Sequence, residues 1–226
     1  MTLRRAMLAA AAVTALWCTL AIGVPATEGA HTTADEPQYL LSATSLAEDG
    51  DLDIADELDE ERWRAYHRAR LPDQTLARPD GRRLSPHGPL LPVVLALTMG
   101  LGGWVGAKLA LAALAGALAA SLVWVAVRRL AVPTPLALAC VLCFTLSPPL
   151  AVYGSQVYPE LPAALVVTVG LAAVTGPLGR RDSAVLGVCV TALPWLSVKY
   201  AAVAAALAGY ALWRLWHRGD HRRARS

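Results

Sequence analysis

The chain has 226 residues, of which 56% are hydrophobic and 16% are charged, and its formal net charge is +3. A soluble domain of this size is usually about 45 to 50% apolar and about a quarter charged, so the composition argues against one and predicts an integral membrane protein. All acidic residues except Glu160, Asp182 and Asp220 fall between Glu28 and Asp80. The net charge is therefore an average over an acidic segment and a remainder with few acidic residues, and it gives no indication of nucleic-acid binding.

The first apolar segment runs from Ala6 to about Val24 and follows Arg4 and Arg5. A basic flank, an apolar run and small residues after it fit a cleaved signal peptide as well as a membrane anchor. We favour an uncleaved first span, residues 1–25, because the apolar part is long for a signal peptide. The basic flank predicts a cytoplasmic N-terminus.

Further apolar runs follow the polar segment, and runs near 20 residues are typical of transmembrane helices. They are Pro89 to Val105, Ala107 to Val127, Thr134 to Val152, Leu161 to Leu178, and Ala184 to Trp216. If each run crossed once, the pairs Arg128-Arg129 and Arg180-Arg181 would lie outside, whereas short cytoplasmic loops normally hold such residues.

The conflict disappears if Pro89 to Val105 does not cross the membrane. This run is short and contains two prolines and three glycines. We predict an outer interfacial or re-entrant helix, which is allowed at membrane depth only where protein or water covers its backbone. Both arginine pairs then face the cytoplasm, and the loop from Tyr153 to Glu160 faces outside.

The last run is too long for one ordinary span and contains Pro194, which kinks a helix. Two half-spans with a break from Pro194 to Lys199 would return the basic tail to the cytoplasm. One long tilted helix is the alternative and would put the tail outside. The predicted fold is thus all-α, a polytopic transmembrane bundle of about five or six spans. The first helix and residues 106–226 form the bundle. Residues 26–105 form a large outer loop that contains amphipathic and interfacial helices.

The cysteines all lie in apolar segments, and no disulfide framework is implied. Cys140 and Cys143 have the spacing of a redox or zinc pair. Within an apolar helix this spacing more often gives two small buried side chains, which is what we predict.

The acidic segment Glu48 to Glu61 has the composition of a solvated helix face or a flexible stretch. An EF-hand loop counted from Asp49 needs Gly at its sixth place and Glu at its twelfth. Ile54 and Glu60 stand there. Only the second fits, so the pattern does not predict an EF-hand.

Three polar clusters share the outer side in this topology: Asp35 to Tyr39, Ser85 to Pro89, and Gln156 to Glu160. Paired carboxylates can supply a general base and metal ligands, and an ionisable residue at the edge of an apolar helix is a functional hypothesis by default. Each cluster also has a structural interpretation as a helix start, with Pro and an acidic residue in the first turn. Their shared side favours a common site.

The ordered set of motifs resembles the N-terminal part of membrane glycosyltransferases of the GT-C class, which use polyprenyl-phosphate sugars and include protein mannosyltransferases and lipid A aminoarabinose transferases. The matching motifs are Asp35-Glu36-Pro37-Gln38-Tyr39, the segment Leu40 to Asp53, the segment Pro86 to Pro92, the long Ala/Leu span that ends at Arg128-Arg129, Leu146-Ser147-Pro148-Pro149, the segment Tyr158 to Pro162, and Leu193 to Tyr200. Members of that class usually continue well past this length, so we expect missing spans or a divided enzyme.

The resemblance implies sugar transfer at the outer face of the plasma membrane. Asp35 would be the general base that deprotonates an acceptor hydroxyl or amine, and Glu36 would support it or hold a divalent cation together with His87. The implied substrate-binding residues are Tyr39, His87, Tyr158, Glu160, Lys199 and Tyr200. His87 would face the donor phosphate, while Lys199 would line the lipid-carrier groove or extend to the membrane interface.

The implied partners are a polyprenyl-phosphate-linked sugar, membrane lipid, and a second membrane protein or the missing C-terminal half. The alternative function is a non-catalytic polytopic scaffold or remnant subunit that pairs with a longer membrane protein. A transporter function has weaker support, because ion pathways usually need ionisable groups within the membrane, and Lys108 and Lys199 are the only candidates within the predicted spans.

Overall fold

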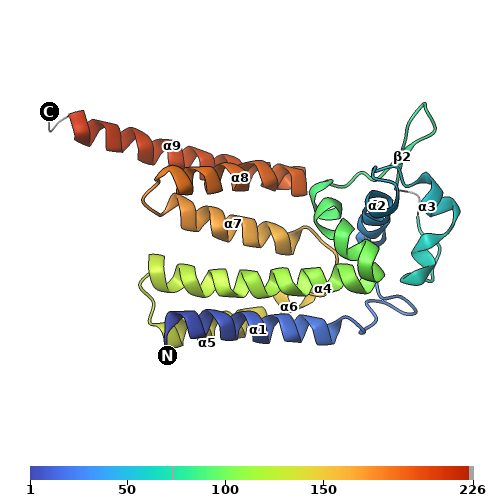
Figure 1. Ribbon diagram of the computed structural model, residues 1–226, viewed down its shortest axis with the longest axis horizontal. Helices are drawn as coiled ribbons and strands as arrows, with labels where there is room; N and C mark the ends of the chain where they lie inside the picture. The colour runs from blue at the N-terminus through green and yellow to red at the C-terminus, as the bar shows by residue number, and fades with distance from the viewer. Residues whose placement is uncertain (73, 224–226) are drawn as a thin grey trace.

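The structure is a computed structural model that describes residues 1–72 and 74–223 (Figure 1). These residues are mostly helical, and the sheet they form is a single two-stranded antiparallel hairpin. The elements in chain order are α1 (Leu3–Ala21), α2 (Glu36–Glu48), α3 (Ala55–Asp59), the 3-10 helix η1 (Arg62–Ala65), β1 (Leu76–Ala77), β2 (Arg83–Leu84), α4 (Leu90–Arg129), α5 (Thr134–Thr145), α6 (Leu150–Tyr153), α7 (Glu160–Val174), α8 (Arg180–Leu196), the 3-10 helix η2 (Val198–Tyr200) and α9 (Ala201–Arg223). The prediction of a helical fold is confirmed.

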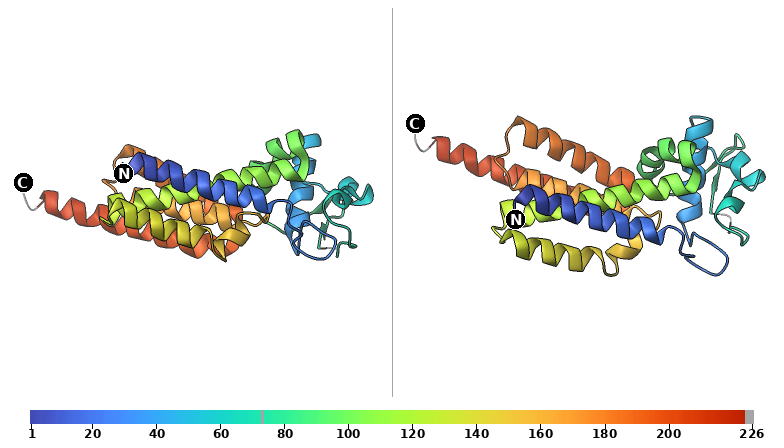
Figure 2. Two further views of the ribbon diagram at one scale, coloured as in Figure 1. Left: turned by 90° about the horizontal axis from the view of Figure 1, so that it is seen from below. Right: turned by 60° about the horizontal axis from the view of Figure 1, so that its bottom comes forward.

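The helices form two parts that meet end to end. The bundle consists of α1, the later part of α4, α5, α7, α8 and α9, which lie side by side (Figures 1 and 2). The cap, residues 22–72 and 74–101, holds α2, α3, η1, the hairpin and the first turns of α4. The N-terminus and the last described turn of α9 lie at the end of the bundle away from the cap (Figure 1).

A kink separates the cap part of α4 from its bundle part. Gly102 has φ −142° and ψ 15°, and Gly103 has φ 59° and ψ −154°. The second combination is accessible almost only to glycine. The break agrees with the predicted separation of the two apolar runs, while the interfacial position of the first run stays a prediction.

The last apolar run is divided as predicted. Helix α8 ends at Leu196, Ser197 is extended, and α9 returns antiparallel to α8 (Figure 1). Pro194 has no N–H to donate to the carbonyl one turn earlier, which weakens the end of α8. The alternative of one long helix is wrong.

The third apolar run forms a shorter helix than predicted. Helix α5 ends at Thr145, and a turn with Pro148 and Pro149 leads into α6. Neither proline can donate a main-chain hydrogen bond, so the helix does not continue. At 1.5 Å per residue α5 is about 18 Å long, well short of the roughly 30 Å of a hydrocarbon core.

Two helices, α1 and α4, are long and apolar enough to cross a membrane, and α5 and α7 are shorter apolar helices. Large apolar side chains stay exposed on the bundle, among them Leu8, Leu20, Val188 and Leu212. Exposed apolar surface of this kind is typical of contact with lipid or with another protein. Membrane association thus has support from two helices, fewer than the predicted five or six spans.

The cysteine prediction is wrong in part. Cys18 and Cys189 are buried, but Cys140 and Cys143 are exposed, and all four are free. Helix α5 packs against α1 and α4 from the outside of the bundle, so the side chains on its other face have no neighbouring helix to cover them.

Candidate functional site

The residues predicted for substrate binding gather where the cap meets the bundle. They come from the start of α2, the turn before α4, the start of α7 and the break between α8 and α9. We call this set the junction site: Asp35, Tyr39, His87, Tyr158, Glu160, Lys199 and Tyr200.

The phenol of Tyr39 shows how close these groups are. Burial raises the pKa of Tyr39, and the charges of Glu160 and Asp35 raise it further, with smaller contributions from Tyr200 and Tyr158. A charge has this effect only at short range, since exposed charges are screened beyond about 10 Å. Residues far apart in the sequence therefore lie near the side chain of Tyr39.

Asp35 and His87 lie next to each other on the cap side of the site. Asp35 is the N-cap residue of α2 but makes no side-chain cap bond, and its side chain is 44% exposed. His87 stacks on the ring of Tyr39, with centroids 4.7 Å apart, and its Nε2 lies 4.0 Å from Asp35 Oδ1. Burial lowers the pKa of His87 more than Asp35 raises it, so the imidazole is neutral near pH 7.

Gly88 sets the position of His87 by a close approach to α8. A Cβ atom at Gly88 would collide with the carbonyl oxygens of Trp195 and Leu196. The absence of a side chain thus lets the turn before α4 pack directly on the last turn of α8. This contact joins the cap to the bundle at the site.

Glu160 and Lys199 form an ion pair on the bundle side of the site. Lys199 Nζ lies 2.5 Å from Glu160 Oε1, and the lysine side chain is 54% exposed. Its hydrogen bond to Glu160 raises the pKa of Lys199. An ammonium group held in this way at the site entrance is available to an anionic ligand.

Several polar atoms of the site are buried and have no hydrogen-bond partner in the described part of the chain. They are His87 Nε2, Glu160 Oε2 and Tyr200 Oη. Buried polar groups in folded proteins are nearly always hydrogen-bonded. Three such atoms from three segments indicate a place for a polar ligand or ordered water.

Tyr158 has a partner already. Its hydroxyl donates to the carbonyl oxygen of Thr33 at 3.0 Å, and its ring meets that of Tyr153 edge to face. Burial, with Glu36 and Asp35, raises the pKa of Tyr158 to about 12. The residue holds the loop before α7 against the loop before α2.

Glu36 lies beside the junction site but is not open to it. It is fully buried, and its two oxygens accept hydrogen bonds from the main-chain N–H groups of Thr33 (2.8 Å) and Val157 (2.7 Å). Lys108 Nζ lies 3.9 Å away and donates to the carbonyl oxygen of His31 at 2.6 Å.

These contacts give Glu36 a structural part in joining the loop before α2 to the loop before α7. Its catalytic role, and the metal pair of Glu36 and His87, stay predictions. Sequence reasoning noted Lys108 only as an isolated charge in an apolar run and missed its buried partner. The sequence does contain a signal for this partner, because a lone lysine in an apolar run needs a compensating acidic residue.

Comparison with family models, with curated proteins and with solved structures finds no match. The chemistry of the site is therefore the basis for inferring the function. It offers a half-exposed carboxylate, a neutral imidazole, an accessible ammonium group and buried polar atoms in need of partners.

Proposed function

We propose that the chain is a multi-pass membrane protein of the glycosyltransferase type, acting on a polyprenyl-phosphate-linked sugar at the outer face of the membrane. The observation that carries the proposal is the set of unpartnered buried atoms on His87, Glu160 and Tyr200 beside the accessible groups of Asp35 and Lys199. Sugar hydroxyls can donate to and accept from such atoms, and a phosphate fits the ammonium group.

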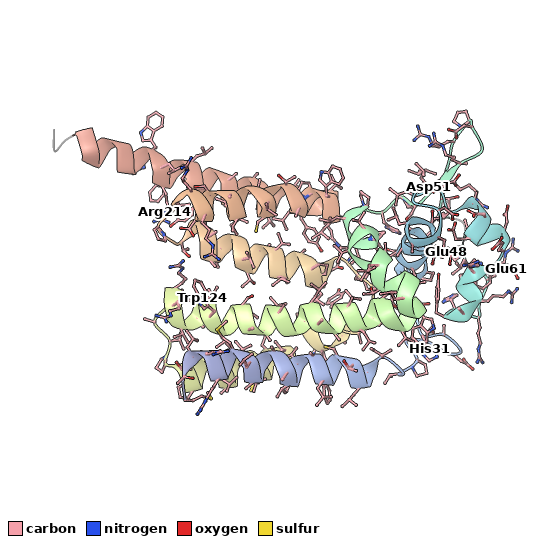
Figure 3. All side chains as sticks on the ribbon, viewed as in Figure 1. His31, Glu48, Asp51, Glu61, Trp124 and Arg214 are labelled. Carbon is pink, nitrogen blue, oxygen red and sulfur yellow. The ribbon has the colours of Figure 1, made fainter. Side chains whose placement is uncertain are left out.

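The distribution of basic residues supports an outer position for the cap. The pairs at Arg128 and Arg180 end α4 and begin α8 at the end of the bundle away from the cap, and Arg214 lies there too (Figures 1 and 3). Glu48 and Asp51 are in the cap (Figure 3). Because arginine favours the cytoplasmic side, the junction site would face the outside, with α7, α8 and α9 crossing alongside α1 and α4.

In the proposed reaction Asp35 is the general base. Its carboxylate takes the proton of an acceptor hydroxyl or amine while the acceptor atom forms a bond to the anomeric carbon of the donor sugar. The bond from that carbon to the phosphate oxygen breaks, and the polyprenyl phosphate leaves with one more negative charge. The ammonium group of Lys199 would stabilise this charge.

His87 has a different role in this scheme from the one the resemblance implies. A neutral imidazole is a poor partner for a phosphate, but its Nε2 can form a hydrogen bond with a sugar hydroxyl or with Asp35. Its stacking on Tyr39 fixes the ring for that contact. We therefore propose that His87 orients the sugar.

The test is sugar transfer in membranes that contain the full chain and radiolabelled polyprenyl-phosphate sugars. Asp35→Asn should lower transfer by about 10²- to 10⁴-fold, the usual contribution of a general base. Asp80→Asn is the matched control, because Asp80 is an exposed cap residue paired with Arg82 in the hairpin turn.

Equal transfer by Asp35→Asn and the wild type would sink the assignment of the base. Absence of transfer by the wild type, together with co-purification of another membrane protein, would favour the scaffold function instead.

A further inference from the structure

A second polar cluster lies at the other end of α2, about 20 Å along the helix axis from Asp35. Asp49 is the C-cap residue of α2, and Asp56 and Glu57 are in the first turn of α3. One carboxylate oxygen from each of the three lies within 4.8 Å of the others. The two aspartates are exposed, whereas Glu57 is only 3% exposed.

Glu57 is buried without any compensating partner among the described residues. Both of its oxygens are inaccessible, and neither accepts a hydrogen bond from a basic side chain or from the main chain of another residue. The hydroxyl of Tyr66 is also buried without a partner, and the charge of Glu57 adds to burial in raising the pKa of Tyr66. An ionised carboxylate in such a place is costly unless a cation or a proton compensates it.

The neighbouring charged residues do not supply that cation. Arg62 is near enough to Asp49 to oppose the rise in its pKa, but its ion pairs are with Glu48 and Glu60. Asp53 accepts main-chain N–H groups and belongs to the turn rather than to the cluster. The trio therefore has no ion-pair partner of its own among the described residues, and one side of it is open to solvent.

We propose that Asp49, Asp56 and Glu57 bind a calcium ion, with Glu57 as the buried ligand and the two aspartates on the solvent side. Carboxylate oxygens alone suit a hard cation, and no cysteine or histidine is among them to favour zinc. Ca²⁺ accepts several carboxylate ligands in flexible geometry, whereas Mg²⁺ requires a near-ideal octahedron and usually keeps several of its waters. A cluster of three carboxylates therefore suits Ca²⁺ better.

The site does not follow the EF-hand pattern. Its ligands come from the end of one helix and from two adjacent residues at the start of the next, with water completing the shell. The ion would fix α3 to the end of α2. This goes beyond the proposed function, because it concerns the folding of the cap and not the transfer reaction.

The experiment uses the full chain purified in detergent and freed of metal with a chelator. Isothermal titration with CaCl₂ should show one bound ion per chain, and the melting temperature should rise with calcium concentration. Glu57→Gln should weaken binding by at least about tenfold, since it removes the buried ligand charge. Asp59→Asn, a neighbouring exposed acid on α3 outside the trio, should bind as the wild type does.

Asp56→Asn provides a second test on an exposed position, in case Glu57→Gln fails to fold, and it should also weaken binding. Absence of calcium binding to the wild type, or unchanged binding by Asp56→Asn, would overturn the proposal. An equal rise in melting temperature with Mg²⁺ at the same concentration would overturn the assignment to calcium.

Discussion

The bundle and the cap share one buried apolar cluster, but the cap depends in addition on individual polar contacts. Leu111 and Leu161 belong to this cluster in the bundle, and Leu40 and Trp63 belong to it in the cap. In the cap, short elements depend on individual polar groups: Ser45 Oγ donates to the carbonyl oxygen of Asp53 at 2.6 Å, and Asp53 Oδ1 accepts from the N–H of Arg83 at 2.8 Å. Apolar packing tolerates substitutions of similar volume, whereas a buried polar group left without its partner is costly. Single substitutions should therefore act most strongly in the cap and at its junction with the bundle.

The largest effect is expected at Lys108, which joins the two parts through Glu36 and the carbonyl oxygen of His31. Lys108→Met should lower the free energy of unfolding by about 3 to 5 kcal/mol, because Glu36 stays buried without its cation. Thermal unfolding in detergent and limited proteolysis of the cap would measure it.

The double variant Lys108→Met, Glu36→Gln has no buried charge at this place and should recover part of the loss. A melting temperature of Lys108→Met equal to that of the wild type would show that the two parts do not depend on this pair.

The second effect concerns pH and the cap alone. Burial raises the pKa of Glu57 from 4.5 to about 8. Between these values the folded chain binds a proton that the unfolded chain has released, so stability falls as pH rises from about 4.5 to 8 and then levels off. The loss should reach a few kcal/mol without calcium.

Melting temperatures across this range should fall for the wild type in chelator and should be flatter for Glu57→Gln. A wild-type profile no steeper than that of Glu57→Gln would contradict the prediction.

The third effect tests the contact of the cap with α8. Gly88→Ala forces a Cβ against the carbonyl oxygens of Trp195 and Leu196, and overpacking of this kind costs about 1 to 3 kcal/mol. Because His87 is the preceding residue, sugar transfer should fall as well. The control Gly187→Ala adds the same methyl group on α8 with no atom within 4 Å, and it should leave stability equal or higher. Equal destabilisation by the two variants would show that the close approach is unimportant.

The difference between the parts also explains what the sequence could predict. Apolar runs and prolines indicated most bundle helices, the break near Pro194 and the kink before the second span, because these depend on local composition. The arginine pairs predicted that Asp35, His87 and Glu160 would lie at one end, and in the structure they do. The roles of these residues stay predictions.

Other features depend on contacts that a sequence does not display. Asp35 and Glu36 look alike as neighbours, but the helix turns one toward the site and the other inward. The burial of Glu57 follows from how α3 packs on α2, and the exposure of Cys140 follows from the outer position of α5. Pattern reasoning treats such residues by type, whereas their environment decides what they do.

The smallest effect is expected at the end of the bundle away from the cap. Ala131 follows the C-cap of α4 and has φ 55°, a left-handed conformation that glycine adopts without strain. Ala131→Gly should raise the free energy of unfolding by about 0.5 to 1 kcal/mol, since the relief of strain exceeds the extra freedom of the unfolded chain. Ala126→Gly, inside the same helix, should instead lower it by about 1 kcal/mol. Paired melting curves in one detergent would measure both changes. Loss of stability in both variants would mean that the left-handed conformation of Ala131 does not strain the turn after α4, and that this turn depends on contacts of the Ala131 side chain, as the cap depends on individual polar contacts.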